Sequence, residues 1–316
     1  MYNVGIDLGG TTIKGGIVDK TGKIIISKAI PTNAERTGKE IIKDIANLSN
    51  ELIEKSGINI SEINSIGIGS PGLIDSRNKK IILASNIDFN NINVEEEMKK
   101  YINIDIFIEN DANCATVAEF YCGSMKNYNS GVMLTIGTGI GGGVILDGKL
   151  IKGDYLGETE LGHTIVDYSG QKCKCGQKGC LEVFSSATAI INYAKTLIYE
   201  NKNTKTKILD FAKDIDNINA KFVFEAYDLK DELATKVIER FNQYMAVAIV
   251  NYINIFRPGV FCIGGGVSAR GEKLINPIIE KAQELILGNK LECPIVTAIL
   301  GNDAGIIGAA MLYNAQ

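Results

Sequence analysis

The stretch that decides the fold is VGIDLGGTTIKGGIVD at residues 4–19, where a glycine turn joins two apolar runs. Alternating apolar residues before Gly9 and an apolar run after Thr12 predict a strand, a turn and a second strand. The stretch VMLTIGTGIGGGVILD at residues 132–147 repeats this pattern, with the same spacing from its glycine turn to its closing aspartate. One unit that occurs twice predicts two related domains and not a solenoid. The alternative to a repeat is that these two stretches are unrelated buried hairpins with similar sequences.

Apolar spacing and stop signals predict further helices and strands around these units. Steps of three and four between apolar residues, ended by Gly57, predict a helix near residues 36–55. A long helix near residues 232–256 is stopped by Arg257-Pro258-Gly259. Asn276-Pro277 fits the cap and first turn of another helix, ending at Gly288. Short segments predict strands at residues 65–69, 104–108 and 260–263 and a last helix from Asp303 to about Tyr313.

Composition places the chain among ordinary globular proteins. It has 316 residues, of which 45% are hydrophobic and 22% are charged, so it can bury a core. The net charge of −4 lacks the basic footprint of a protein that binds nucleic acid or an anionic membrane. The N-terminus has no basic secretory segment, and the uncharged stretches 128–146 and 241–256 are too rich in glycine or amides for a membrane span. We therefore expect a soluble, cytoplasmic protein.

Three glycine turns are candidate phosphate-binding loops, because glycines let backbone N–H groups approach an anion closely. Threonine hydroxyls add donors in two turns, and Lys14 could add charge. No segment matches the Walker pattern, and the G-x-G-x-x-G segments at residues 67–72 and 137–142 are not followed by helix-like sequence, which disfavours a dinucleotide-binding dehydrogenase. The turns favour a nucleotide bound between two domains. Their residues are Gly9, Gly10, Thr11 and Thr12; Gly137, Thr138 and Gly139; and Gly264 and Gly265.

The cysteines predict a metal site. Three of the seven lie together as Cys173, Cys175 and Cys180, and His163 is the single histidine of the chain. Three thiols and an imidazole are a ligand set that tetrahedral zinc prefers, and four protein ligands leave no open position, so the zinc would be structural. A lone histidine is ordinarily a hydrogen-bonded residue and not a ligand, but the neighbouring cysteines reverse that expectation.

Carboxylates near these motifs are candidates for chemistry. Asn110-Asp111 follows a predicted strand and opens a helix, where a carboxylate could accept a hydroxyl proton as a phosphoryl group arrives. Helix capping is the alternative, since Asn302-Asp303 repeats the pair at another helix start. Glu160 and Glu182 lie on either side of the cysteine cluster, and a rigid loop that holds both could bind hydroxyl groups.

Together these motifs resemble the ROK family of sugar kinases and sugar-responsive regulators, over essentially the whole chain. The segment CKCGQKGCLE at residues 173–182 is specific to its zinc-containing, glucokinase-like members. The resemblance implies an α/β, two-domain fold of the actin-like ATPase (ribonuclease H-like) type, with ATP and sugar in the interdomain cleft. The implied N-terminal domain is residues 1–115 plus 303–316, and the C-terminal domain, with the zinc loop, is residues 116–302. The other matching motifs are DLGGTT at 7–12, GSPG at 69–72, ENDA at 109–112, TGIGGG at 138–143 and the segment 157–163.

The resemblance also implies roles for individual residues. Asp111 looks like the general base for the sugar's 6-hydroxyl, and His163 would place one ring nitrogen on zinc and the other towards sugar. Glu160 is preferred to Glu158 because Glu-x-Gly-His fits the family pattern. Asp7 looks like the residue near Mg²⁺ and phosphate. The implied substrate-binding residues are Gly72, Asn86, Asn110, Asp111, Glu160, His163 and Glu182, and the implied ATP-loop glycines are Gly9, Gly10, Gly137, Gly139, Gly264 and Gly265.

The implied activity is an ATP-dependent sugar kinase acting on the 6-hydroxyl of a hexose, with Mg²⁺ as the ATP partner and a structural Zn²⁺. Glucose is the first choice of substrate, followed by N-acetylmannosamine, N-acetylglucosamine, fructose or allose. A non-catalytic sugar-sensing regulator is the alternative from a different class. Repressors of the family carry a helix-turn-helix ahead of the kinase-like body, whereas the first phosphate loop here begins at Asp7. We expect a homodimer or homotetramer, with no nucleic-acid or membrane partner.

Overall fold

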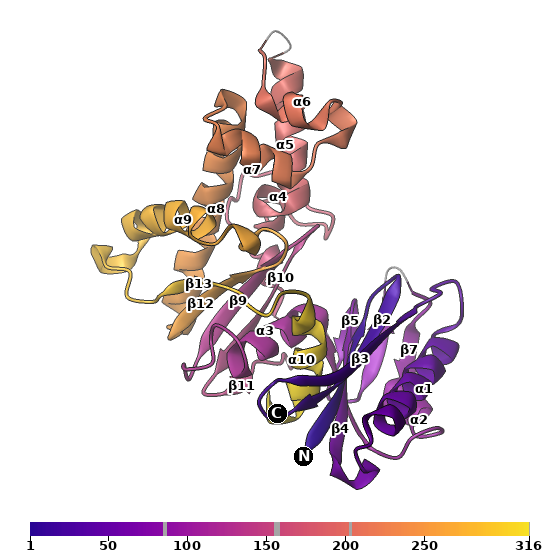
Figure 1. Ribbon diagram of the computed structural model, residues 1–316. Helices are drawn as coiled ribbons and strands as arrows, with labels where there is room; N and C mark the ends of the chain where they lie inside the picture. The colour runs from indigo at the N-terminus through magenta and orange to yellow at the C-terminus, as the bar shows by residue number, and fades with distance from the viewer. Residues whose placement is uncertain (85–86, 155–158, 202–203, 316) are drawn as a thin grey trace. The chain divides into compact units, whose positions relative to one another are not determined.

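The computed structural model describes residues 1–84, 87–154, 159–201 and 204–315 (Figure 1). The chain folds into two compact units. Unit 1 comprises Met1–Gly131, Gly143–Thr159 and Ile299–Gln316, and unit 2 comprises Val132–Gly142 and Glu160–Ala298. The domain boundaries expected from the sequence, 1–115 with 303–316 and 116–302, remain a prediction.

The first sheet, in unit 1, has the strand order β3-β2-β1-β4-β8. Its first three strands form an antiparallel meander, and β4 and β8 run parallel to β1. Parallel strands end at the same edge of a sheet, so Asp7 pairs with Gly69 and Ser70 pairs with Asn110 at one edge. This edge positions the candidate residues of unit 1. The strands are β1 (Tyr2–Leu8), β2 (Thr12–Asp19), β3 (Ile24–Pro31), β4 (Ile63–Ser70) and β8 (Asp105–Asn110).

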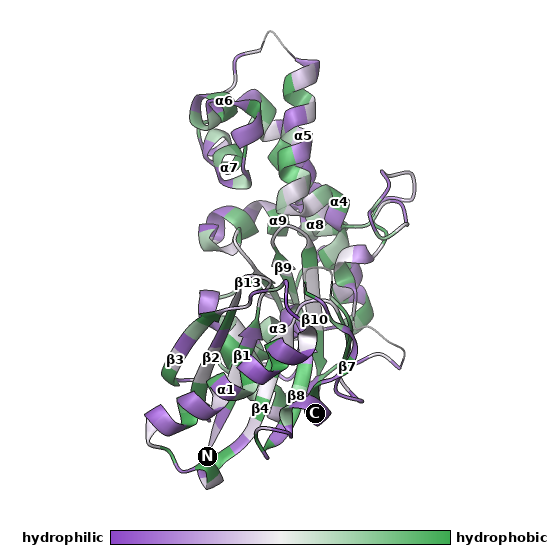
Figure 2. Cartoon of the chain, turned by 90° about the vertical axis from the view of Figure 1, so that its right-hand side faces the viewer, coloured by the Kyte–Doolittle hydropathy of each residue, from purple (hydrophilic) through white to green (hydrophobic). Residues whose placement is uncertain are grey.

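Two helices cover opposite faces of this sheet. A Cβ built on Gly15 of β2 would meet Leu48 and Leu52 of α1 (Gly38–Ser56), whereas one on Gly16 would meet Ile306 of α10 (Ala304–Met311). Neighbouring strand residues point to opposite faces, which separates the two helices. Figure 2 shows hydrophilic colour on the outer face of α1 and hydrophobic colour along β1. The sheet therefore forms the middle layer of unit 1.

The α1 helix was expected near residues 36–55 and begins at Gly38, and its predicted stop at Gly57 is confirmed. Thr37 and Glu40 form a capping box at its start, and Gly57 ends it in the left-handed conformation. The α10 helix lies so close to β4 that a Cβ on Gly67 would be 1.8 Å from the carbonyl oxygen of Ala309. Only glycine permits that approach of helix and strand.

The second sheet repeats the order of the first. Its order is β11-β10-β9-β12-β13, so each sheet has a run of three consecutive strands followed by two later ones. The predicted strand–turn–strand unit at residues 132–147 forms β9 and β10, which matches the repeat expected from the sequence. A small third sheet has the order β5-β6-β7. These strands are β9 (Gly131–Ile136), β10 (Ile140–Leu146), β11 (Lys149–Leu150), β12 (Val260–Gly264), β13 (Ile295–Thr297), β5 (Leu73–Asp75), β6 (Lys80–Leu83) and β7 (Asn90–Asn93).

One predicted helix start is wrong. The α9 helix runs over Glu272–Leu285 with Pro277 inside it, so Asn276-Pro277 is neither its cap nor its first turn. Leu274 and Ile278 are both buried, one turn apart on either side of the proline. A proline inside a helix removes a backbone hydrogen bond and costs about 3 kcal/mol. Burial of the apolar side chains on either side of Pro277 offsets this cost.

The other long helix is confirmed. The α8 helix spans Glu232–Phe256, is capped by Asp231 and ends at Arg257 in the left-handed conformation. The remaining α-helices are α2 (Val94–Met98), α3 (Asp111–Tyr121), α4 (Glu182–Ser185), α5 (Ala187–Glu200), α6 (Lys207–Ala212) and α7 (Ala220–Asp228). Short 3₁₀ turns lie at Ile60–Glu62, Leu161–His163, Ile215–Asn217, Ser268–Arg270, Leu287–Asn289, Gly301–Asp303 and Leu312–Ala315.

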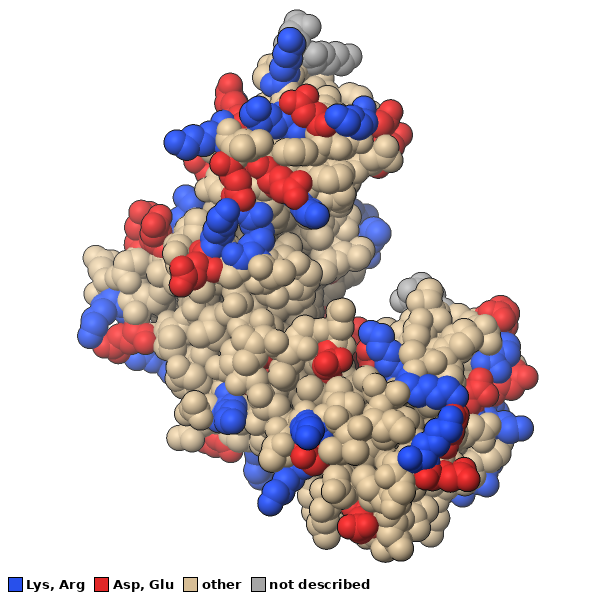
Figure 3. Space-filling model, viewed as in Figure 1, with Lys and Arg blue, Asp and Glu red and all other residues tan. Residues whose placement is uncertain are grey.

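The surface of each unit carries both signs of charge. Figure 3 shows Lys and Arg side chains interspersed with Asp and Glu on the face drawn, with no extended area of one sign. Among the described helices, none combines the length and the hydropathy that crossing a bilayer requires.

Candidate functional site

The first glycine turn, in unit 1, is held by its own backbone. The Gly9 N–H donates to the Thr12 carbonyl at 3.0 Å, and the Thr32 hydroxyl donates to the Gly9 carbonyl at 2.7 Å. Gly10 and Thr11, at the tip of the turn, keep some exposure. Those N–H and hydroxyl groups are the donors that an anion would use.

Asp7, at the end of β1, lies beside this turn and beside a helix start. Its Oδ2 is 3.8 Å from Lys14 Nζ, and burial raises the pKa of Asp7 while Lys14 opposes that rise. A Cβ on Gly305 would lie 2.6 Å from the Asp7 carboxyl carbon, so the first turn of α10 packs directly on this side chain. A partly buried carboxylate of this kind is a hard oxygen ligand suited to Mg²⁺. No local sequence pattern marks Gly305, because its partner Asp7 is distant in the chain.

Asn110 and Asp111 join β8 to α3 as the sequence predicted. Asn110 is the helix cap, and its side-chain oxygen accepts the Ala112 N–H at 2.8 Å. Asp111 Oδ1 accepts the same N–H at 2.8 Å, and the Asp111 residue is exposed. Its carboxylate is thus oriented at the first turn of the helix and reachable by a ligand.

The two Asn-Asp pairs, Asn110-Asp111 and Asn302-Asp303, differ in whether they cap the helix that follows. Asp303 stands at the start of α10 without a side-chain capping hydrogen bond, because its backbone is already helical, with φ −87° and ψ −11°. Asn110 has the extended backbone of a cap, with φ −66° and ψ 152°. Capping therefore accounts for Asn110 and not for Asp303.

Glu109 stabilises the junction between Asn110 and Asp111 through hydrogen bonds to its neighbours. It is fully buried, and its Oε1 accepts the Asn110 N–H at 3.1 Å and the Asn113 amide at 3.3 Å. Its Oε2 lies 3.8 Å from Lys152 Nζ. A buried carboxylate requires such partners, and its position next to Asp111 is a signal that sequence reasoning overlooked.

Glu160 and Glu182, in unit 2, occupy different surroundings. Glu160 is exposed at the start of the turn Leu161–His163. Glu182 opens α4, and its Oε2 accepts the Ile140 N–H at 2.9 Å. A Cβ on Gly139 would lie 2.3 Å from that oxygen, so the second glycine turn is fitted around the Glu182 carboxylate.

The Glu160–His163 segment is anchored by a residue that the sequence did not single out. The buried Tyr252 hydroxyl donates to the Leu161 carbonyl and shares a hydrogen bond with the Thr164 hydroxyl. Burial raises the pKa of Tyr252 to about 12, so the hydroxyl keeps its proton. No local pattern distinguishes Tyr252 within α8, since its partners are far away in sequence.

The predicted metal ligands converge. The ligand atoms of His163, Cys173, Cys175 and Cys180 all lie within 4.8 Å of one another. Cys173 Sγ is 3.7 Å from His163 Nδ1, and Cys175 Sγ is 3.6 Å from Cys180 Sγ. Zn–S bonds of about 2.3 Å and Zn–N bonds of about 2.0–2.1 Å at a tetrahedral centre require edges of about 3.8 Å between sulfurs and about 3.6 Å between sulfur and nitrogen. The four residues therefore fit zinc.

The chemistry of the cluster agrees with its geometry. All three cysteines are free thiols. Burial and the neighbouring thiols raise the pKa of Cys180 to about 12, and a dication would reverse that effect. Because Nδ1 is the nitrogen that faces Cys173, Nε2 is the His163 nitrogen available on the other side of the ring.

Two glycine turns of unit 2 border one cavity. It has a volume of about 510 Å³ and is walled by the 137–138 turn, by α7 and by the segment after β12. Arg270 stacks over the Phe224 ring at 4.6 Å and pairs with Asp228 at 2.7 Å. An apolar chamber beside a glycine turn suits a nucleotide base with its phosphates at the turn. Its lining residues are Ile136, Gly137, Thr138, Ala187, Ala220, Lys221, Phe224, Glu225, Gly266, Val267, Ala269 and Arg270.

The predicted site residues are divided between the two units. Gly264 is buried at the end of β12, and Gly265 turns next to Ile136 with φ 85°. Gly72 lies in the turn after β4, with φ 101°. Asn86 and the rejected alternative Glu158 fall outside the described residues. The roles of all these residues in binding remain predictions.

Solved structures share this fold. A ROK family glucokinase from Streptomyces griseus, in complex with glucose and AMPPNP, has a TM-score of 0.79 and 29% identity, covering 99% of both chains. A ROK hexokinase from Thermus thermophilus has a TM-score of 0.83 and 28% identity, covering 98% of this chain and 97% of that one. The fold is that of the actin-like ATPases, as the sequence implied.

The family follows from the sequence comparison. The family model described as ROK family matches residues 3–316, and the chain belongs to the ROK family. A glucokinase from Thermotoga maritima is 36% identical over 312 residues, which are 98% of this chain and 96% of that protein. A xylose repressor from Bacillus spizizenii is 29% identical over 98% of this chain and 76% of the repressor.

Proposed function

We propose that this chain is an ATP-dependent glucokinase, which transfers the γ-phosphoryl group of ATP to the 6-hydroxyl of glucose. The observation that carries the proposal is the full-length similarity to glucokinases, one of them solved with glucose and AMPPNP. The exposed Asp111 carboxylate at the start of α3 is the group that the reaction needs.

In this proposal Asp111 accepts the proton of the 6-hydroxyl as the oxygen bonds to phosphorus. Phosphoryl transfer passes through a loose transition state, so positioning and charge stabilisation contribute more than covalent help from the protein. Glu109 fixes the backbone of Asn110 and so orients the neighbouring carboxylate. The N–H groups of the glycine turns and Lys14 bind phosphate oxygens.

The sugar hydroxyls are assigned to Asn110, Glu160, Glu182 and His163, with Gly72 and Asn86 as further contributors. Zinc, held by the four-ligand cluster, would fix the His163 ring with Nε2 turned towards the sugar. Mg²⁺ bound with ATP would be held near Asp7 and neutralise phosphate charge.

The decisive experiment replaces Asp111 by Asn in a coupled assay of ADP release with glucose. Loss of a general base should lower kcat by about 10² or more, while the circular dichroism spectrum and glucose binding stay unchanged. Asp303→Asn is the matched control, because the same Asn-Asp-Ala motif opens α10 without a capping bond. Unchanged turnover in Asp111→Asn would refute the assignment.

The second candidate is a sugar-binding regulator without kinase activity, favoured by the similarity to a xylose repressor. Saturable sugar binding with no ADP release, across glucose, N-acetylmannosamine, N-acetylglucosamine, fructose and allose, would support it. A kcat/KM that is highest for glucose supports the glucokinase. If kcat/KM is highest for an N-acetylhexosamine or for fructose, the proposed function changes to a kinase of that sugar. Light scattering would establish whether a dimer or a tetramer forms.

A further inference from the structure

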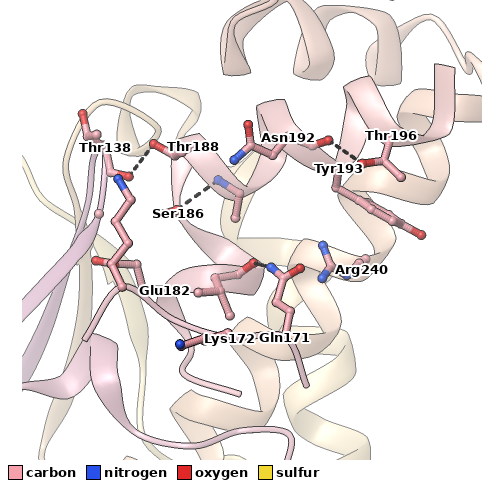
Figure 4. A pocket seen from close by; sticks show the side chains of 14 residues that line it. Thr138, Gln171, Lys172, Glu182, Ser186, Thr188, Asn192, Tyr193, Thr196 and Arg240 are labelled. Carbon is pink, nitrogen blue, oxygen red and sulfur yellow. Dashed lines mark hydrogen bonds between the residues drawn. The ribbon is translucent and has the colours of Figure 1, made fainter. Parts of the chain in front are cut away.

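A second cavity of unit 2 borders the predicted sugar contacts: Thr138, Gly139 and Glu182 line one part of it, and its other lining residues have no role in the proposed reaction. It has a volume of about 600 Å³, within the range of small-molecule sites. Figure 4 shows Thr138 and Glu182 towards one end, Arg240 and Tyr193 towards the other, and Asn192 across from Gln171 and Lys172. The wall is built from the second glycine turn, the start of the cysteine loop, α4, α5 and one residue of α8.

Arg240 is the most unusual group in this cavity. Its guanidinium lies 4.2 Å from the centre of the Tyr193 ring, 4.9 Å from that of Phe184 and 5.8 Å from that of Tyr244. Phe184 and Tyr244 also stack on each other at 3.9 Å. The cation lies over the faces of these rings, and burial lowers the pKa of Arg240 without discharging it.

The N–H edge of this cation has no acceptor among the described residues. Arg240 forms no ion pair and no hydrogen bond there, and the carboxylate whose field reaches it, Asp167, already accepts from Ser169 and Tyr244. A guanidinium that is held by aromatic rings and has no acceptor for its N–H groups can form two parallel hydrogen bonds to a phosphate or carboxylate.

The cavity as a whole has an excess of positive charge. Lys172 and Lys174 line it together with Arg240, and neither lysine forms an ion pair within the described part of the chain. Glu182 is the single carboxylate of the lining, and its Oε2 is already bound by the Ile140 N–H. Three cations around one cavity repel one another, and an anionic ligand would relieve that repulsion.

The remaining wall is suited to hydroxyl groups. The Thr188 hydroxyl donates to the Thr138 carbonyl at 2.7 Å and the Thr196 hydroxyl donates to the Asn192 carbonyl at 3.0 Å, so both oxygens can still accept. The Asn192 side-chain amide, with donors and an acceptor, makes no hydrogen bond in the described residues and faces the cavity (Figure 4). Amides and hydroxyls of this kind bind the hydroxyls of a polyol.

We propose that this cavity is a second ligand site, which binds a phosphorylated monosaccharide with its phosphate on Arg240 and Lys172 and its hydroxyls towards Asn192 and Thr196. The choice of a hexose 6-phosphate as probe rests on the proposed function, since it would be the product of that reaction. The site itself rests on the cations, the cavity and the polar wall.

Isothermal titration calorimetry with glucose 6-phosphate tests the site on the intact chain without ATP. Saturating glucose is present, so that binding at the sugar site of the proposed reaction is blocked. We expect saturable binding to the wild type, weakened about tenfold or more in Arg240→Gln and severalfold in Lys172→Gln. Lys236→Gln is the matched control: Lys236 lies one turn earlier on α8, pairs with Glu232 at 2.8 Å and should leave the affinity unchanged.

Separate outcomes overturn the proposal. Absence of saturable heat with the wild type overturns it, as does wild-type affinity in both Arg240→Gln and Lys172→Gln. Inorganic phosphate that binds as tightly as glucose 6-phosphate overturns the monosaccharide part. Lys172 is exposed, so its variant remains informative if Arg240→Gln unfolds. The titration needs no turnover, so a protein that binds the probe but phosphorylates no sugar contradicts the proposed function alone.

Discussion

The pair formed by the buried Glu109 and the partly buried Lys152 gives a test of how the Asn110-Asp111 junction is held. Glu109 Oε2 and Lys152 Nζ are 3.8 Å apart, and the side chains are 0% and 19% exposed. At an effective dielectric constant of about 20, two charges at this distance attract by about 4 kcal/mol. The cost of burying the Glu109 carboxylate cancels part of that attraction.

The two single variants should therefore differ. Glu109→Gln removes the attraction but also the buried charge, and its amide oxygen can still accept the Asn110 N–H, so we expect a loss of about 1–2 kcal/mol in the free energy of unfolding. Lys152→Met leaves the carboxylate buried without its counter-charge and should cost more, about 3 kcal/mol. The double variant should be more stable than the sum of the single losses predicts.

Urea unfolding followed by circular dichroism measures these free energies, and the coupled assay measures kcat. We expect Lys152→Met to lower kcat by about tenfold through the disturbed junction, with little change in the KM for ATP. Lys149→Met, on the exposed residue of β11, is the control and should change neither quantity. A Lys152→Met protein as stable as the wild type, or less affected than Glu109→Gln, would show that this pair does not hold the junction.

Three further variants probe the metal ligands, Asp7 and the packing of α10. Elemental analysis should find one equivalent of zinc in the wild type, and Cys175→Ser should lose this zinc and have a lower Tm. A wild type that contains no zinc and is as stable as Cys175→Ser would contradict the ligand set. Burial raises the pKa of Asp7 in the folded state, so the folded protein loses stability as the pH rises above the pKa that Asp7 has in the unfolded chain. Asp7→Asn should therefore be at least as stable as the wild type at pH 7 but inactive. A variant that is less stable than the wild type would contradict this pH dependence. Gly67→Ala would place a Cβ 1.8 Å from the Ala309 carbonyl oxygen and should cost about 3 kcal/mol or more in urea unfolding, a prediction that a wild-type midpoint would contradict.

Local sequence was sufficient to predict a feature when all the residues that form it lie within one short segment. The capping box at Thr37 and the left-handed Gly57 give α1 both of its ends. The metal ligands were predictable because three of the four lie within one short loop. Pro277 was misjudged because proline can open a helix or lie inside one, and burial of Leu274 and Ile278 favoured the second use.

Sequence alone determined the repeated strand–glycine turn–strand units and the Cys₃His cluster, and the family resemblance made Asp111 the candidate base, a role that stays a prediction. These depend on residue type and on spacing along the chain, which a linear pattern preserves. Only the tertiary structure decided that Glu109 is buried with the Asn110 N–H and Asn113 as partners, that Tyr252 anchors the Glu160–His163 segment, and that Arg240 lies over three aromatic rings beside a cavity. Burial, ion pairing and ring stacking join residues that are distant in sequence, so no local pattern contains them.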